Sequence, residues 1–346
     1  MPASLPPRLS RRCFLTASAL AARTLLAAAQ GGASRLGICT FSCHQRWKLA
    51  GPADAMAFYR HARELGAEGV QSPLRGAEPG AVRALVEQSG GYYEGELRLP
   101  QSANDLPAFE TEVRRTREAG ATVARAVFTN GRRYEAFRTL EAFRAFQQQA
   151  KATAQLIEPV LKKHRLKLAI ENHKDHTTEE LVALMKAISS EWLGVLVDTG
   201  NNLALLEEPH RVVEALAPFA LSVHLKDMAV QNVPDGFLLS EVPLGKGFLD
   251  LPRMVATLRR ANPTIVINLE MATRDPLRIP CLTDAYFATF PERKATLLEA
   301  AMQRVKQHPP KAPVPVVSGK PNDQVLAEEE RNNRHGIAWM RRELPA

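Results

Sequence analysis

Short apolar runs recur along the chain, and longer segments with helical spacing separate them. Four of these runs open the segments 168–175, 193–198, 221–227 and 265–270, and they are rich in Leu, Val and Ile. Uninterrupted apolar runs of this length are typical of parallel strands that are buried on both faces. The pattern therefore predicts an α/β protein built from parallel strands and connecting helices.

The part of the chain before residue 168 shows the same alternation of short apolar runs and longer amphipathic segments. We expect strands at 36–41, 69–72, 92–99 and 122–128, and helices at 54–65, 81–88, 106–119 and 135–163. Asp54 can cap the first of these helices and Gly66 can end it. A last helix is expected at 293–306.

A side chain that can bind a metal stands at or near the end of each of the four downstream apolar runs. These side chains are Glu171, Asp198, His224 and Glu270. The first two spacings fit one strand–helix–strand repeat of roughly 30 residues, and the third leaves room for a long loop. Because the carboxyl ends of parallel strands meet on one side of a sheet or barrel, we expect the four to converge there. Three carboxylates and one imidazole suit Mn²⁺ or Mg²⁺ best, with Co²⁺ or Zn²⁺ as alternatives.

The sequence around these residues resembles a known family. The stretches IENH, VDTGNN, VHLKD and INLE are similar to those of the xylose-isomerase-like TIM-barrel superfamily, in its sugar phosphate isomerase/epimerase branch. The resemblance extends over roughly residues 35–306. It implies a (β/α)8 TIM barrel, for which we expect the boundaries 35–307. It also implies that Glu171 and Glu270 form the catalytic acid/base pair, while Asp198 and His224 mainly hold the metal.

The chemistry implied is proton abstraction next to a metal-bound carbonyl group, which gives an enediolate and leads to isomerisation or epimerisation of a sugar. Two alternatives remain open. The same intermediate allows a lyase or dehydratase to perform β-elimination on 3-keto-glycosides or keto-sugars. A protein of another class, a non-catalytic sugar-binding barrel, would keep the site without turnover.

Further polar residues at expected strand ends and in the loops after them are candidates for contact with a carbohydrate substrate. They are His44, Arg125, Arg133, His173, Asn201 and Lys226. Arg125 lies within an expected strand, where an unpaired charge is costly, so it either neutralises a barrel carboxylate or reaches toward an anion. Some epimerases have a histidine where Asn201 stands, and ketose epimerases have an arginine where Val230 stands. We therefore expect altered substrate contacts.

Charge is distributed unevenly along the 346 residues. The formal net charge is +8, but residues 1–34 contain four arginines and no acidic residue. The excess that remains for the barrel is small, and no basic stripe is evident. This distribution argues against nucleic acid as a partner.

The first 34 residues resemble a twin-arginine (Tat) export signal. Arg11 and Arg12 precede an Ala/Leu-rich stretch, and small residues follow it. The resemblance implies the twin-arginine export machinery as a partner and a periplasmic location in a bacterium.

The last segment, 308–346, begins with a proline-rich stretch that is expected to be extended, and a helix follows at about 324–343. We expect this tail to pack along the barrel or to reach a neighbouring subunit of a homo-oligomer.

Overall fold

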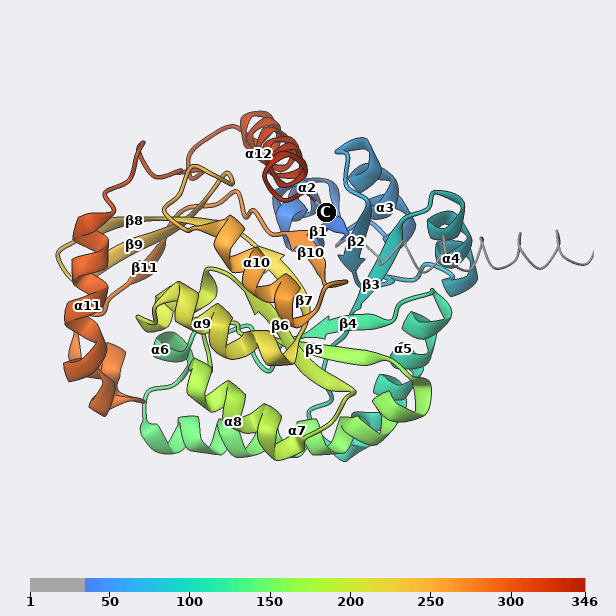
Figure 1. Cartoon of the computed structure of the whole chain (residues 1–346), viewed down its shortest axis with the longest axis horizontal. Helices are drawn as coiled ribbons and strands as arrows, with labels where there is room; N and C mark the ends of the chain where they lie inside the picture. Colours follow the sequence, from blue (N-terminus) through green and yellow to red (C-terminus); the bar gives the residue numbers. More distant parts are fainter. Residues whose placement is uncertain (1–34, 346) are drawn as a thin grey trace, which may run out of the picture. The chain divides into compact units, whose positions relative to one another are not determined.

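Eight parallel strands close into a barrel in the computed structural model, which describes residues 35–345 (Figure 1). The strands are β1 (Leu36–Cys39), β2 (Gly69–Ser72), β3 (Tyr92–Glu96), β4 (Val123–Ala126), β5 (Lys167–Glu171), β6 (Leu193–Asp198), β7 (Ala220–Leu225) and β10 (Val266–Leu269). They follow one another around the barrel in chain order, and β10 pairs with β1 to close it. The predicted (β/α)8 barrel is thereby confirmed, whereas the predicted export signal lies outside the described residues.

The helices that follow the barrel strands begin and end where local signals favour it. They are α3 (Ala55–Glu64), α4 (Pro79–Gln88), α5 (Leu106–Glu118), α7 (Leu140–His164), α8 (Thr178–Ile188), α9 (Pro209–Leu216) and α10 (Leu251–Ala261). The side chain of Asp54 accepts a hydrogen bond from the backbone of Ala57 and so caps α3. Thr177 and Glu180 form a capping box at the start of α8. No helix within residues 35–345 is long and apolar enough to cross a bilayer.

A small antiparallel sheet stands where the sequence analysis expected a long loop. It contains β8 (Asp227–Val233), β9 (Gly236–Val242) and β11 (Leu277–Ile279). β8 and β9 form a hairpin across Pro234 and Asp235, and β11 joins the outer edge of β9. The hairpin follows β7 directly, so it extends from the barrel rim beside the candidate site.

The last two helices cover different parts of the molecule. α11 (Lys294–Gln307) contacts β8 of the small sheet, whereas α12 (Asn322–Glu343) contacts β1, β10 and the short helix α2 (His44–Ala50) (Figure 1). Helix α12 therefore completes the helical layer around the barrel, a place that the sequence analysis gave to residues 293–306. Of the two places expected for the C-terminal tail, the structure thus shows packing along the barrel.

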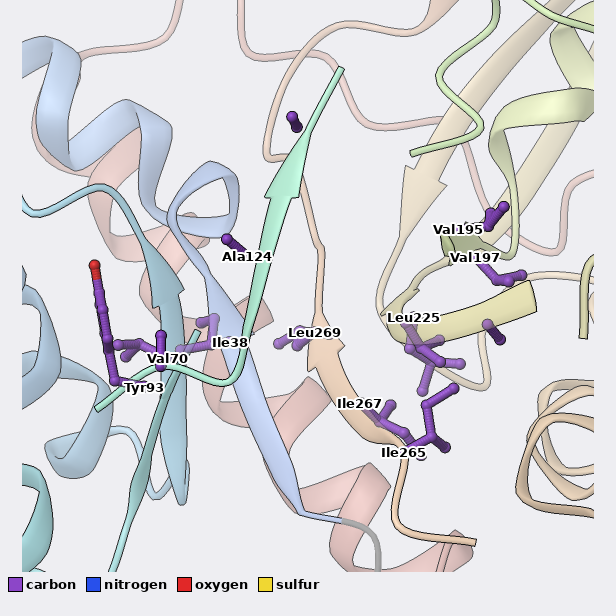
Figure 2. Packing of buried hydrophobic residues seen from close by; sticks show 14 of the residues in the cluster. Ile38, Val70, Tyr93, Ala124, Val195, Val197, Leu225, Ile265, Ile267 and Leu269 are labelled. Atoms are coloured by element: carbon purple, nitrogen blue, oxygen red, sulfur yellow. The ribbon is translucent and has the colours of Figure 1, made fainter. Parts of the chain in front are cut away.

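Side chains alternate between two environments along the barrel strands. Ile38, Val70, Leu225 and Leu269 belong to the main hydrophobic core (Figure 2). Residues one position away from them face the barrel interior, as successive side chains of a strand must point to opposite sides. Four of the inward residues are polar and hydrogen-bond to one another; they are Gln71, Glu94, Ser222 and Asn268. The interior below the candidate site is therefore polar.

Candidate active site

The four predicted metal ligands converge at the carboxyl end of the barrel. Glu171 and Asp198 are the last residues of β5 and β6, His224 lies near the end of β7, and Glu270 follows β10 directly. One ligand atom from each residue lies within 4.8 Å of the ligand atoms of the other three, and all four residues are buried. Nδ1 of His224 lies 2.6 Å from Oε2 of Glu270 and 3.7 Å from Oε2 of Glu171. The structure thus brings together carboxylates and an imidazole that are far apart in the sequence.

Three of these four residues present a buried polar atom without a hydrogen bond. The atoms are Oδ2 of Asp198, Nδ1 of His224 and Oε2 of Glu270. Their contacts are ion pairs: Oδ2 of Asp198 lies 2.9 Å from Nζ of Lys226, and the other two atoms lie 2.6 Å from each other. A divalent cation among the four side chains would satisfy all three atoms at once. The donor set of three carboxylates and one imidazole fits such an ion.

A hydrogen-bonded chain fixes the orientation of His224. Its Nε2 lies 2.7 Å from Oε1 of Gln71, whose Nε2 donates to Oε2 of Glu94 at 2.9 Å. Since the Gln71 amide nitrogen is the donor toward Glu94, its oxygen is the acceptor for the imidazole N–H. His224 therefore carries a proton on Nε2, and its Nδ1 faces the other three residues. Burial raises the pKa of Glu94 to about 7.

Two cations, the partly buried Arg125 and the buried Lys226, balance the carboxylates. The guanidinium of Arg125 donates to Glu171 at 2.7 Å and to Glu96 at 2.9 Å. Of the two roles considered for Arg125, the structure shows charge neutralisation. Burial alone would raise the pKa of Glu171, but Arg125 and His224 hold it at about 2. The ammonium of Lys226 lies between two carboxylates, 2.9 Å from Asp198 and 3.2 Å from Glu270.

Asn201 connects the carboxylates to two lysines. Its Nδ2 donates to Oε1 of Glu171 at 2.8 Å, and its Oδ1 accepts from Lys226 at 3.2 Å and from Lys174. Burial and the neighbouring Lys226 ammonium lower the pKa of Lys174 to about 8. Burial likewise lowers the pKa of His173 to about 4.

A cavity of about 300 Å³ opens onto this cluster. His173, Lys174, His224 and Glu270 line its wall, together with Arg125. The polar groups of the site and the cavity therefore form one continuous space that can hold a small polar ligand.

Four of the six predicted substrate contacts do not line this cavity. Asn201 and Lys226 contact the carboxylates of the cluster instead, whereas His44 and Arg133 lie elsewhere. His44 stacks on Phe41, with 4.9 Å between the ring centroids, and hydrogen-bonds to the Phe41 carbonyl. Arg133 is only 2% exposed, because it lies over the ring of Phe143 and donates to Glu180 and Thr289. Arg133, which was predicted to contact the substrate, lies in the protein interior instead.

Two charged residues near the site were missed by the sequence analysis. Lys174 was passed over because a lysine in a polar loop is usually solvated. Glu241 lies in strand β9, where it binds Arg274 through two hydrogen bonds and comes within 3.9 Å of Lys226. Alternating apolar residues on both sides of Pro234-Asp235-Gly236 could have indicated this hairpin.

Comparisons with known proteins agree with this architecture. The sequence matches the family model described as "Xylose isomerase-like TIM barrel" over residues 59–306, more than half of the chain. It is 33% identical over 115 residues to 3-oxo-isoapionate decarboxylase of Pectobacterium atrosepticum. That match covers 33% of this chain and 42% of the decarboxylase, so it spans less than half of the relative's length.

Solved structures show the same fold at low sequence identity. An L-ribulose 3-epimerase aligns with a TM-score of 0.58 and 13% identity, over 90% of this chain and 94% of the epimerase. The IOLI protein with a bound zinc atom aligns with a TM-score of 0.51 and 13% identity, over 79% of this chain and 95% of that protein.

Proposed function

The chain belongs to the xylose isomerase-like TIM-barrel family, and from this membership we propose that it is a divalent-metal-dependent isomerase or epimerase of a carbohydrate. The observation that carries the proposal is the convergence of Glu171, Asp198, His224 and Glu270 within 4.8 Å, with three buried atoms that have no hydrogen bond. These four residues would hold the ion, and Mn²⁺ or Mg²⁺ suits their three carboxylates. When bound, the cation would polarise a sugar carbonyl group and acidify the adjacent C–H bond.

Glu171 and Glu270 are the proposed acid/base pair. One carboxylate removes the proton from the carbon beside the carbonyl, and the electron pair of the C–H bond moves into an enediolate. The other glutamate returns a proton to the opposite face of that carbon, which completes an epimerisation. Lys226 lies 3.2 Å from Glu270, and Arg125 donates to Glu171, so both carboxylates are oriented by a cation.

A lyase reaction is the second candidate, and the decarboxylase relative favours it. In β-elimination the electron pair of the intermediate expels a leaving group. In decarboxylation the bond to a carboxylate breaks, carbon dioxide departs, and the bonding pair forms the same enolate before an acid protonates it. Both reactions use the carbonyl polarisation that isomerisation requires, so the same site serves either outcome.

Hydrogen exchange tests the proton abstraction that isomerisation and β-elimination share. We expect Mn²⁺-loaded protein, incubated in D₂O with ketohexoses and 3-keto-glycosides, to place deuterium on the carbon next to the carbonyl group. NMR of the recovered sugar measures the exchange and separates an epimer from an eliminated product. The change Glu270→Gln should slow exchange by at least about 100-fold. The matched change Glu141→Gln, at an exposed position of α7, should leave it unaltered.

Two outcomes would contradict the proposal. If metal analysis finds a bound ion but no sugar exchanges, isomerisation and β-elimination are rejected. If the purified protein binds no divalent ion in calorimetry, the metal-dependent mechanism fails.

A further inference from the structure

Lys174 is a buried lysine in an unfavourable backbone conformation. Its φ is +86°, in the left-handed region that residues with a side chain rarely occupy, and holding such a residue there costs energy. The carbonyl of Lys174 accepts a hydrogen bond from the backbone of Arg133 at 2.9 Å, which helps to keep this conformation. The residue is 5% exposed, and it lines the same cavity as His224 and Glu270. The fold thus maintains an ammonium group at the candidate site at some cost in stability.

Lys174 differs from the other cations of the site in its partners. Arg125 is matched by Glu96 and Glu171, Lys226 by Asp198 and Glu270, and Arg274 by Glu241. Within residues 35–345, no carboxylate lies at ion-pair distance from Lys174, whose side chain donates only to the neutral amide of Asn201. Lys226 donates to that same amide oxygen, so two ammonium groups share one uncharged acceptor. A buried cation normally has an anionic partner, and this one has none from the protein.

The charges around the cavity point to an anion as the missing partner. Five carboxylates surround the site, namely Glu96, Glu171, Asp198, Glu241 and Glu270. Four cationic side chains oppose them: Arg125, Lys174, Lys226 and Arg274. A divalent ion held by the proposed ligands would turn this balance into one excess positive charge. A ligand with a single negative charge would then make the loaded site neutral.

We propose that Lys174 anchors a carboxylate of the substrate, so that the enzyme acts on acidic keto-sugars in preference to neutral ketoses. This inference rests on the proposed function, because it assumes that the cavity receives a carbohydrate. Lys174 contacts the ligand through a charge-assisted hydrogen bond, and Asn201 holds the ammonium in place when the site is empty of ligand. The role assigned to Lys174 is recognition of the substrate and not proton transfer.

Sugars that differ only in one oxidised carbon provide the test. The same carbon skeleton occurs in D-fructose, 2-keto-D-gluconate and D-fructuronate. The carboxylate stands next to the carbonyl group in 2-keto-D-gluconate and at the far end of the chain in D-fructuronate. Equilibrium dialysis with mass spectrometry of the free sugar gives each dissociation constant, in Mn²⁺ and again in EDTA. We expect at least one acid to bind about 10- to 100-fold more tightly than D-fructose, the range of one charge-assisted hydrogen bond.

Variants of Lys174 test whether the positive charge of this side chain causes the preference for the acid. Lys174→Gln should abolish the preference for the acid and leave D-fructose binding within about threefold, whereas Lys174→Arg should retain it. Lys186→Gln, at an exposed position of α8, is the matched control and should behave as wild type. Equal loss of affinity for the acid and the neutral sugar in Lys174→Gln would show a structural role and overturn the proposal. A preference that survives Lys174→Gln would overturn it as well.

If Lys174→Gln does not fold, binding measurements on the wild-type protein still test the proposal. Equal affinity for D-fructose and both acids would then suffice to reject it. The deuterium-exchange measurement separates this inference from the proposed function, because binding of a sugar acid requires no turnover. A Lys174-dependent preference for an acid in Mn²⁺-loaded protein that exchanges no deuterium would support the carboxylate anchor while the proposed chemistry fails.

Discussion

The hydrogen bond between Gln71 and His224 determines which nitrogen of the imidazole is available to a metal. Gln71 is 0% exposed, and its oxygen lies 2.7 Å from Nε2 of His224. Partners of this kind hold a metal-binding histidine in one tautomer and one orientation. Gln71 therefore acts as a positioning residue, although it reaches the site only through another side chain.

Replacing Gln71 by leucine should weaken metal binding. Without the acceptor, the Nε2–H of His224 loses its partner, and the imidazole can turn or move its proton to Nδ1. We expect the change Gln71→Leu to raise the Mn²⁺ dissociation constant by about 10- to 100-fold, as measured by titration calorimetry. The control Gln149→Leu, at an exposed position of α7, should bind as wild type does. An unchanged dissociation constant in the Gln71 variant would show that His224 needs no such support.

Some residues of the candidate site could be predicted from the sequence, and others could not. Glu171, Asp198 and Glu270 end apolar strands, so the register of a parallel barrel brings them together without knowledge of any loop. The burial of Arg133 depends on Glu180 and Thr289, which lie 47 and 156 residues away in the chain. No local sequence pattern predicts contacts with residues so far away in the chain.

At the scale of secondary-structure elements, α12 holds the short helix α2 against the barrel. The carboxylate of Glu329 accepts hydrogen bonds from the backbone N–H groups of Gln45 at 2.7 Å and Arg46 at 2.9 Å. These N–H groups belong to the first turn of α2, which has no partner for them within the helix. Asn333 also donates to the carbonyl of Ser42 at 2.8 Å. A distant helix thus supplies the cap that the local sequence of α2 lacks.

Removing the Glu329 carboxylate should destabilise the protein by about 2 kcal/mol, because one buried and one partly buried N–H group lose their acceptor. Urea unfolding of Glu329→Ala at pH 8, above the pKa of about 7 to which burial raises this carboxyl, measures the loss. Glu343→Ala alters an exposed carboxylate of the same helix and serves as the control. A difference below about 0.5 kcal/mol between the two variants would mean that α2 does not depend on this cap.

The sequence predicted the barrel elements better than the elements inserted between them. Strand β6 has the expected bounds, since its apolar run is unbroken and ends in Asp198. The β8–β9 hairpin was expected as a loop because polar residues, among them Gln231, Asn232 and Ser240, interrupt its apolar runs. Its strands therefore give a weaker hydrophobic signal than the unbroken runs of the barrel strands, although most of their residues are buried.

At the scale of the whole molecule, the polar barrel interior makes stability depend on pH. Glu94 is buried, and its folded-state pKa of about 7 exceeds the ordinary value of 4.5. Between these values the folded protein binds more protons at Glu94 than the unfolded chain does. The contribution of Glu94 to the free energy of unfolding therefore falls as the pH rises from 4.5 to about 7.

The change Glu94→Gln should remove this pH-dependent loss. The free energy of unfolding of the variant, minus that of the wild type, should increase by up to about 3 kcal/mol across this window. Urea titrations between pH 4.5 and 8 in the presence of EDTA measure the difference, and Glu141→Gln should give a curve parallel to that of the wild type. A parallel curve for Glu94→Gln would show that the carboxyl is not protonated in the folded barrel.

The contact between α12 and the start of the barrel also constrains biosynthesis. Asn333 binds the carbonyl of Ser42 across 291 residues of chain. At roughly 5–20 residues per second, a ribosome needs about 15 to 60 s to translate the sequence between these two partners. During that interval the nascent chain exposes the surface of β1 that α12 later covers, so a chaperone that shields apolar strands has its longest opportunity to act there.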